Sequence, residues 1–285
     1  MKRLVVLITM FMVTGTVFSQ KPSTGLPGKQ LLFDSTWQLT PRIQEREIRY
    51  LDSGDKKVVV QVIKARLKKN KLILEAATPD NKDQFGRQVV PEEMKAENLA
   101  GSEVLAGVNA DFFNMENGTP LGPVVKDHKI IKGAGDKMVA FVGVLKSGRI
   151  IMGDASLFRR KAQKLREALG ARPILLRAGK LLAQDSSSLS KVHHPRTAFG
   201  VSGKQAIYLV TVDGRQPAYS NGISLTDLGK LMRFLGADNA ANLDGGGSTT
   251  MIVKKPGKQQ YKVRNRPSGK TLRPVANSWI IVRKH

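Results

Sequence analysis

The sequence predicts an α/β protein in which a mixed sheet carries flanking helices and follows a β-rich amino-terminal segment. Short apolar segments separated by turn residues predict the strands. Four pairs of such segments predict hairpins: VVVQVIKA with KLILEAA, VAFVGVL with RIIMG, PILLR with KLLA, and TAFGVS with AIYLVTV. A further strand, VLAGVNADFFN, runs into a polar loop at residues 104–114.

Two segments supply the helices of this α/β prediction. In SLTDLGKLMRFLG the leucines and Met232 recur at helical spacing. Ser224 and Asp227 form an amino-terminal capping pattern, and Gly236 suits the carboxyl-terminal stop. A second helix is predicted from about Leu157 to Leu169.

The chain divides into four predicted parts. Residues 1–19 have basic residues, an apolar run and a small residue at Ser19, a pattern typical of a secretory signal peptide. Residues 20–30 form a flexible lead-in, residues 31–103 a β-rich segment that packs on the main domain, and residues 104–285 the main domain. The chain contains no cysteine, which excludes disulfides and thiolate chemistry. We therefore expect a periplasmic or secreted bacterial protein without a membrane span in the mature chain.

The net charge indicates an anionic partner. The chain has 47 Lys and Arg against 23 Asp and Glu, a formal charge of +24. The basic residues are scattered rather than aligned on one helix, and no nucleic-acid recognition motif is present, so we expect no nucleic-acid partner. An anionic glycan, a phospholipid surface or a phosphate ester accounts for the charge equally well.

The segment ANLDGGGSTTMIV carries the strongest chemical signal. Asp244 directly precedes three glycines and three hydroxyl residues, between two short strands. Glycines allow positive φ and close approach of the backbone to a ligand, and consecutive N–H groups can bind an anion. The strand-to-strand setting and the missing lysine argue against a nucleotide-binding P-loop. Asp-Gly is also an ordinary hairpin turn, although three glycines exceed what a hairpin needs.

Several segments in this order resemble the phosphodiester glycosidase family. They are NADFFN with PLGPVV, RPILLRAGK, HPRTAFGVS, VTVDGR, NGISLTDL, NLDGGGSTTM and RPVANS, and the similarity extends from about Val104 to the carboxyl terminus. NADFFN departs from the NGGFF-like form usual in the family, because Asp111 replaces a small residue. The resemblance implies hydrolysis of a sugar-1-phosphodiester between the anomeric carbon and oxygen, which releases a sugar and a phosphomonoester.

The catalytic and phosphate-binding assignments follow from this resemblance and from the chemistry of the leaving group. Phosphate is already a stable anion, so the site needs cationic and N–H groups more than a strong acid. Asp244 is predicted to act as base or nucleophile with Asp213 of VDGR as its partner, although Asp213 is equally suited to a turn. Arg196 and Arg273 are predicted phosphate ligands, because the guanidinium fork can hold two phosphate oxygens.

The remaining expectations concern the rest of the site. The sugar hydroxyls or phosphate oxygens of the substrate are expected to contact Asn109, Gly245, Gly246, Ser248 and Thr249. Asp111 and His194 are further candidates without an assigned role, and a structural role is favoured for His194. Calcium or magnesium could bind an Asp213–Asp244 pair, but no cofactor is required. Trp37 and Trp279 are predicted to be core residues.

Two alternatives stay open at this point. The same fold could be a catalytically silent binder of an anionic exopolysaccharide or cell-wall polymer, because fold does not fix function. An enzyme could also cleave the phosphorus–oxygen bond. The sequence does not identify the sugar, its anomeric form, a retaining or inverting course, or the oligomeric state.

Overall fold

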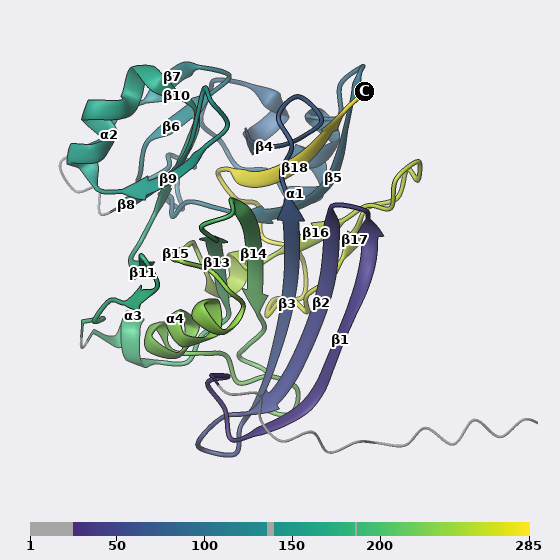
Figure 1. The fold of residues 1–285 in the computed structure, drawn as a ribbon, viewed down its shortest axis with the longest axis vertical. Coiled ribbons are helices and arrows are strands. Elements are labelled where there is room, and N and C mark those ends of the chain that lie inside the picture. Colours follow the sequence, from purple (N-terminus) through teal and green to yellow (C-terminus); the bar gives the residue numbers. More distant parts are fainter. Residues whose placement is uncertain (1–24, 136–139, 186) are drawn as a thin grey trace, which may run out of the picture.

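The computed structural model describes residues 25–135, 140–185 and 187–285, and in these ranges three antiparallel sheets form the framework (Figure 1). The expected signal peptide, and residues 20–24 of the expected lead-in, lie outside the described residues. No helix within the described ranges is long and apolar enough to cross a membrane.

The largest sheet has eight strands. In spatial order they are β1 (Gln30–Thr40), β2 (Ile43–Leu51), β3 (Lys57–Arg66), β14 (Ala206–Val212), β13 (Arg196–Val201), β15 (Asn239–Asn242), β11 (Ile174–Arg177) and β12 (Lys180–Leu181).

Two five-stranded sheets lie beyond one end of the large sheet, in the upper half of Figure 1. One has the order β7 (Lys129–Lys132), β6 (Val124–Lys126), β10 (Leu165–Ala171), β8 (Ala140–Leu145) and β9 (Ile150–Gly153). The other has the order β17 (Lys262–Val263), β16 (Met251–Val253), β5 (Ser102–Asn109), β18 (Ser278–Lys284) and β4 (Leu72–Ala77).

The helices are short and peripheral to the sheets. They are α1 (Val90–Ala96), α2 (Ala155–Lys161), α3 (Ser188–Lys191) and α4 (Leu225–Phe234), with 3-10 turns η1 (Pro79–Asn81), η2 (Ala162–Lys164) and η3 (Gly246–Ser248). Every strand pair in the three sheets is antiparallel. The predicted α/β class with a mixed sheet is therefore wrong, and the protein is mainly β.

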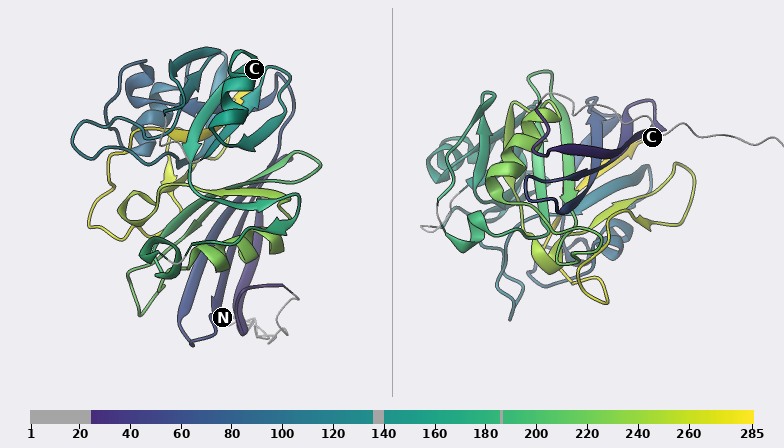
Figure 2. Two further views of the ribbon diagram at one scale, coloured as in Figure 1. Left: turned by 90° about the vertical axis from the view of Figure 1, so that its left-hand side faces the viewer. Right: turned by 90° about the horizontal axis from the view of Figure 1, so that it is seen from below.

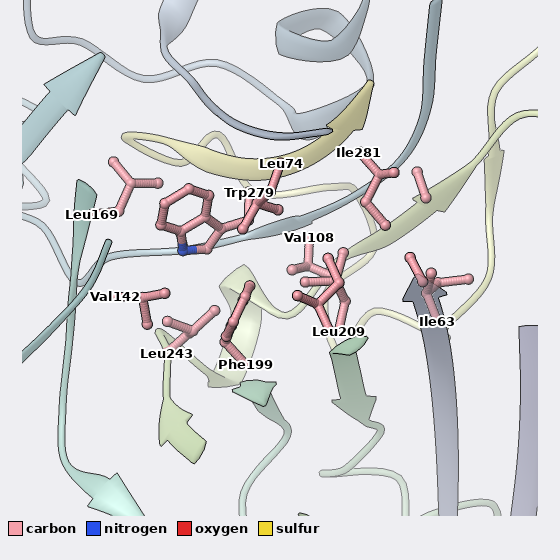
Figure 3. Packing of buried hydrophobic residues seen from close by; sticks show 14 of the residues in the cluster. Ile63, Leu74, Val108, Val142, Leu169, Phe199, Leu209, Leu243, Trp279 and Ile281 are labelled. Atoms are coloured by element: carbon pink, nitrogen blue, oxygen red, sulfur yellow. The ribbon is translucent and has the colours of Figure 1, made fainter. Parts of the chain in front are cut away.

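The central core connects the sheets and anchors the functional turn. Trp279 of β18 packs beside Phe199 of β13 with ring centroids 5.8 Å apart, and Leu243 lies in the same cluster (Figure 3). A second core lies between the large sheet and α4, whose buried residues include Leu228 and Leu231 (Figure 2). Burial of such side chains contributes roughly 1.5–3 kcal/mol each, so both cores hold the strand ends in fixed positions.

Three local predictions agree with the structure. The Ser224 hydroxyl accepts a hydrogen bond from the Asp227 N–H and caps α4, and Gly236 follows the helix with φ +95. The predicted hairpins are present as β8–β9, β11–β12 and β13–β14. Trp279 is fully buried, as predicted.

Three local predictions are wrong, two of them because of long-range strand pairing. The predicted hairpin of residues 57–77 does not form as a strand pair, because β3 pairs with β14 while β4 pairs with β18. The second helix stops at Lys161, and Leu165–Ala171 instead form β10, which is buried between β6 and β8. Trp37 is 43% exposed on the edge strand β1 and is not a core residue.

Strands from both sides of residue 103 share the same sheets. β3 continues the large sheet beside β14, and β4 lies beside β18. Residues 30–77 thus contribute directly to the two sheets that carry the carboxyl-terminal strands.

Candidate functional site

The glycine turn bridges two sheets and presents Asp244 at its start. β15 ends at Asn242, Leu243 is fully buried, and β16 begins at Met251 in the third sheet. The Asp244 N–H donates to the carbonyl of Ala110 at 2.8 Å, which ties the turn to the loop after β5. The position of the Asp244 backbone is therefore fixed from both sheets.

Asn109 holds this turn with its whole side-chain amide. Its Nδ2 donates to the Asp244 carbonyl at 2.7 Å, while its Oδ1 accepts from Thr197 Oγ1 at 2.8 Å and from the Thr250 N–H at 3.0 Å. Asn109 is 1% exposed. These contacts make Asn109 a positioning residue for Asp244.

The Asp244 carboxyl is only partly exposed, and its protonation is shifted. Burial raises its pKa to about 6, although the Ser248 hydroxyl, the Gly245 N–H and the charge of Arg273 each favour the ionised form. Ser248 itself is buried, as is Thr249, whose Oγ1 has no hydrogen-bond partner among the described residues. A carboxylate with a pKa near neutrality in a partly open turn is suited to catalysis.

Two guanidinium groups lie against the glycines. A Cβ on Gly246, which has φ +60, would come within 3.1 Å of Arg215 Nη2. A Cβ on Gly247 would collide with the guanidinium of Arg273. The absence of side chains at these glycines therefore lets two cations approach the turn. No other described residue accepts a hydrogen bond from either guanidinium, so their donors can bind an anion.

The second carboxylate near Asp244 is Asp111. Asp111 is 3% exposed, its Oδ2 accepts from the Gly122 N–H at 2.7 Å, and its carboxyl lies against Gly170. Burial is the main reason that its pKa rises to about 7; the negative charge of Asp244 adds to this rise, while the Gly122 N–H and the charge of Lys132 oppose it. The charge of Asp244 thus favours the protonated form of Asp111.

Asp213 does not share this arrangement. Its carboxylate accepts from the Arg266 N–H at 2.9 and 3.0 Å and from Asn265 Nδ2 at 3.3 Å. The same Nδ2 donates to the Thr249 carbonyl at 3.0 Å. Burial raises the Asp213 pKa to about 6. These contacts describe a buried support behind the turn, linked to it through Asn265, and they do not pair Asp213 with Asp244.

Arg196 is likewise directed away from the glycine turn. It is 2% exposed, and its guanidinium donates to the carbonyls of Leu189, Val192 and Ile223. Burial, together with the smaller effect of the Arg215 charge, lowers its pKa to about 10. Arg196 therefore fixes the segments that precede β13 and α4, and its Nε and Nη2 donors are occupied by backbone carbonyls.

The contacts of His193 and His194 do not place either ring for catalysis, and the two carboxylates expected to share a cation, Asp213 and Asp244, are not paired. Burial lowers the pKa of His194, as do the charges of Arg196 and Arg215. His193 Nδ1 faces Asn221 at 3.3 Å. The described residues contain no cluster of three or more His, Asp or Glu side chains placed to hold a metal ion.

Local sequence alone did not indicate three residues that support the site. Arg215 directly follows Asp213-Gly214 beyond the end of β14, its backbone has φ +59, and its guanidinium lies against Gly246. Asn265 supports the turn as described, and Asn277 Oδ1 accepts from the Asp111 N–H at 2.9 Å. The segments VDGR and RPVANS contain Arg215 and Asn277, but spacing does not reveal where these side chains point.

The family of this mainly β protein is identified by sequence comparison. Residues 102–282 match the phosphodiester glycosidase family, and the chain belongs to it. The chain is 29% identical over 161 residues to the N-acetylglucosamine-1-phosphodiester alpha-N-acetylglucosaminidase of Mus musculus and 29% identical to that of Homo sapiens. The match covers 51% of this chain and 31% of each relative.

Solved structures show the same fold. The catalytic domain of the zebrafish N-acetylglucosamine-1-phosphodiester alpha-N-acetylglucosaminidase superposes with a TM-score of 0.70 at 19% identity, covering 88% of this chain and 87% of that one. A hypothetical protein from Synechocystis gives a TM-score of 0.69 at 15% identity, covering 89% of this chain and 64% of that one.

Proposed function

We propose that this protein hydrolyses sugar-1-phosphodiesters at the bond between the anomeric carbon and oxygen, releasing a sugar and a phosphomonoester. The observation that carries the proposal is the placement of Asp244 beside two guanidinium groups, Arg215 and Arg273, across glycines that leave room for them. Family membership supports the same reaction.

The two arginines supply what a phosphate leaving group needs. Negative charge accumulates on the bridging oxygen as the bond to the anomeric carbon breaks, and fixed cations stabilise this charge without accepting or donating a proton. Guanidinium groups bind phosphate oxygens in a fork geometry. In our proposal Arg215 and Arg273 hold the phosphate, replacing the pair of Arg196 and Arg273.

The two carboxyls take different roles in this proposal. Asp244, with a pKa of about 6, is largely ionised at neutral pH and acts on the anomeric carbon or on the attacking water. Asp111, with a pKa of about 7, retains a proton for part of the time and limits the negative charge beside the bound phosphate. Asp111 therefore takes the place of Asp213 as the second carboxyl.

The proposal is tested by comparing two substrates of one sugar, a 1-phosphodiester and a glycoside with a neutral alkyl group. We expect the wild type to prefer the phosphodiester strongly, and Asp244→Asn to lose turnover of both while staying folded. Arg215→Gln with Arg273→Gln should reduce the preference, because each lost charged hydrogen bond costs about 1.5–3 kcal/mol. Arg42→Gln, an exposed arginine on the β1–β2 turn, is the matched control.

Two outcomes would contradict the proposal. Equal wild-type rates on both substrates would remove the role of phosphate. Binding without turnover, unchanged in Asp244→Asn, would instead identify a silent binder of anionic glycans.

We also propose export to the bacterial periplasm or exterior, on the basis of the residue pattern of Met1–Ser19 and the absence of cysteine. The mass of the protein recovered from the periplasmic or culture fraction tests this proposal. Cleavage after Ser19 is expected, and an uncleaved cytoplasmic chain would contradict it.

A further inference from the structure

A large groove lies apart from the Asp244 turn. It has a volume of about 1260 Å³ and runs between the outer strands β1 and β2 and the β16–β17 hairpin. This hairpin projects beside the upper ends of the outer strands in Figure 1. The lining residues include Trp37, Glu45, Gln259, Gln260 and Arg264, and none of them belongs to the candidate active site.

Trp37 presents an open aromatic ring to this groove. It lies opposite Glu45 in the β1–β2 register, so both side chains leave the same face of the sheet. Glu45 pairs with Arg264 at 2.8 Å, which shows that this face is turned toward the β16–β17 hairpin. Trp37 is 43% exposed. An indole in a groove offers a flat apolar surface together with a polar N–H, which suits the face of a sugar ring.

The opposite wall of the groove is cationic. Lys255, Lys258 and Lys262 line it, are exposed, and pair with no carboxylate among the described residues. The only carboxylate of the lining is Glu45, and Arg264 already neutralises it. Unpaired cations in a concave surface attract an anion more strongly than the same charges on a convex surface.

From these observations we propose that the groove is a binding site for an acidic oligosaccharide, distinct from the catalytic turn. One sugar ring lies on Trp37, the three lysines bind its carboxylate or sulfate groups, and the amides of Gln259 and Gln260 reach its hydroxyls. A single aromatic ring favours a sugar over a single-stranded nucleic acid, which stacks successive bases on several rings. This site does not depend on the proposed reaction.

The test uses the full mature chain with hexagalacturonate as the acidic probe and maltohexaose as the neutral one. The chain has two tryptophans, and Trp279 is fully buried. Iodide should therefore quench only the fluorescence of Trp37, and Trp37→Phe serves as the reference without it. We expect hexagalacturonate to protect Trp37 from iodide, and maltohexaose to give little protection.

Charge variants separate a defined site from diffuse attraction. Replacement of Lys255, Lys258 and Lys262 by Gln should weaken binding of hexagalacturonate by about tenfold or more, because charged contacts dominate it. The matched control replaces three exposed lysines, Lys68, Lys69 and Lys71, by Gln and removes the same charge. The control should bind within about twofold of the wild type.

Four binding results, and a fifth result on self-association, would overturn the proposal. They are equal weakening in the control, equal binding of maltohexaose, no protection of Trp37, and tighter binding of a single-stranded oligonucleotide of equal charge. If a higher protein concentration alone protects Trp37 from iodide and sedimentation shows a dimer, this face binds a second copy of the chain. That result would also overturn the proposal. All variants change exposed side chains, and far-ultraviolet circular dichroism verifies that each is folded.

Discussion

Asp111→Asn should stabilise the folded protein at alkaline pH and have little effect at acid pH. Burial is the main reason that the Asp111 pKa rises from 3.8 to about 7. A tenfold change in an acid dissociation constant corresponds to about 1.4 kcal/mol, so ionising the buried carboxyl costs at most about 4 kcal/mol of folding free energy. Asparagine has a similar shape and avoids this cost.

The pH dependence of this effect follows from the raised pKa. Because the folded pKa lies above the unfolded one, the stabilising contribution of protonated Asp111 is fully present below the unfolded pKa. It is lost as the pH rises through the folded pKa of about 7. The free energy of unfolding of the variant, relative to wild type, should therefore increase by up to about 4 kcal/mol between roughly pH 4 and pH 8.

Urea unfolding at a series of pH values measures this difference directly. Asp55→Asn is a suitable control, because Asp55 is an exposed surface aspartate whose positive φ asparagine tolerates. Its difference from wild type should change little over the same range. Parallel curves for wild type and Asp111→Asn would refute the assignment of Asp111 as a buried carboxyl with a raised pKa.

Three further variants address the neighbouring groups. Gly247→Ala should displace the guanidinium of Arg273, because the added Cβ would collide with it. The variant should have a lower kcat/KM for the phosphodiester and an unchanged kcat/KM for an alkyl glycoside. Equal losses on both substrates would show that Arg273 does not bind the phosphate. Arg196→Lys should lower the free energy of unfolding by about 1.5–3 kcal/mol for each charged hydrogen bond that is lost. Unchanged stability together with a selective loss of phosphodiester activity would instead support the predicted role of Arg196 as a phosphate ligand. The acid limb of kcat/KM should follow the Asp244 pKa of about 6 and should keep this position in Asp111→Asn, because Asp111, with a pKa of about 7, is mostly protonated at pH 6 and adds little negative charge there; a clearly displaced limb would contradict these two assignments.

Some elements of the fold are determined by neighbouring residues, and others depend on residues far apart in the sequence. Helix α4 was predictable because its cap, apolar spacing and Gly236 stop lie within 13 residues. The sheet class was not predictable, since β3 and β4 are neighbours in sequence but pair with β14 and β18, about 140 and 200 residues away. Tertiary pairing also overrides the helical pattern of Leu165–Ala171, which becomes β10.

The candidate site likewise has some features that the local sequence predicts and others that it does not. The three glycines made the Asp244 turn recognisable, because a turn with so little side-chain bulk has a local sequence signature. The direction of a guanidinium has no such signature. Arg196 and Arg215 lie in equally suggestive segments, yet the former binds backbone carbonyls and the latter faces Gly246. Asp111, rather than Asp213, is the carboxyl whose loop contacts the Asp244 turn, because the loop after β5 folds back onto the turn.

The most direct test of the proposed reaction is hydrolysis of a sugar-1-phosphodiester in oxygen-18 water by wild type and Asp244→Asn. Attack at the anomeric carbon places the label in the released sugar and leaves the phosphomonoester unlabelled, which is the result we predict for wild type. Asp244→Asn should release neither product at an appreciable rate. Label in the phosphomonoester would show cleavage of the phosphorus–oxygen bond and would contradict the proposal, as would full activity of a folded Asp244→Asn variant.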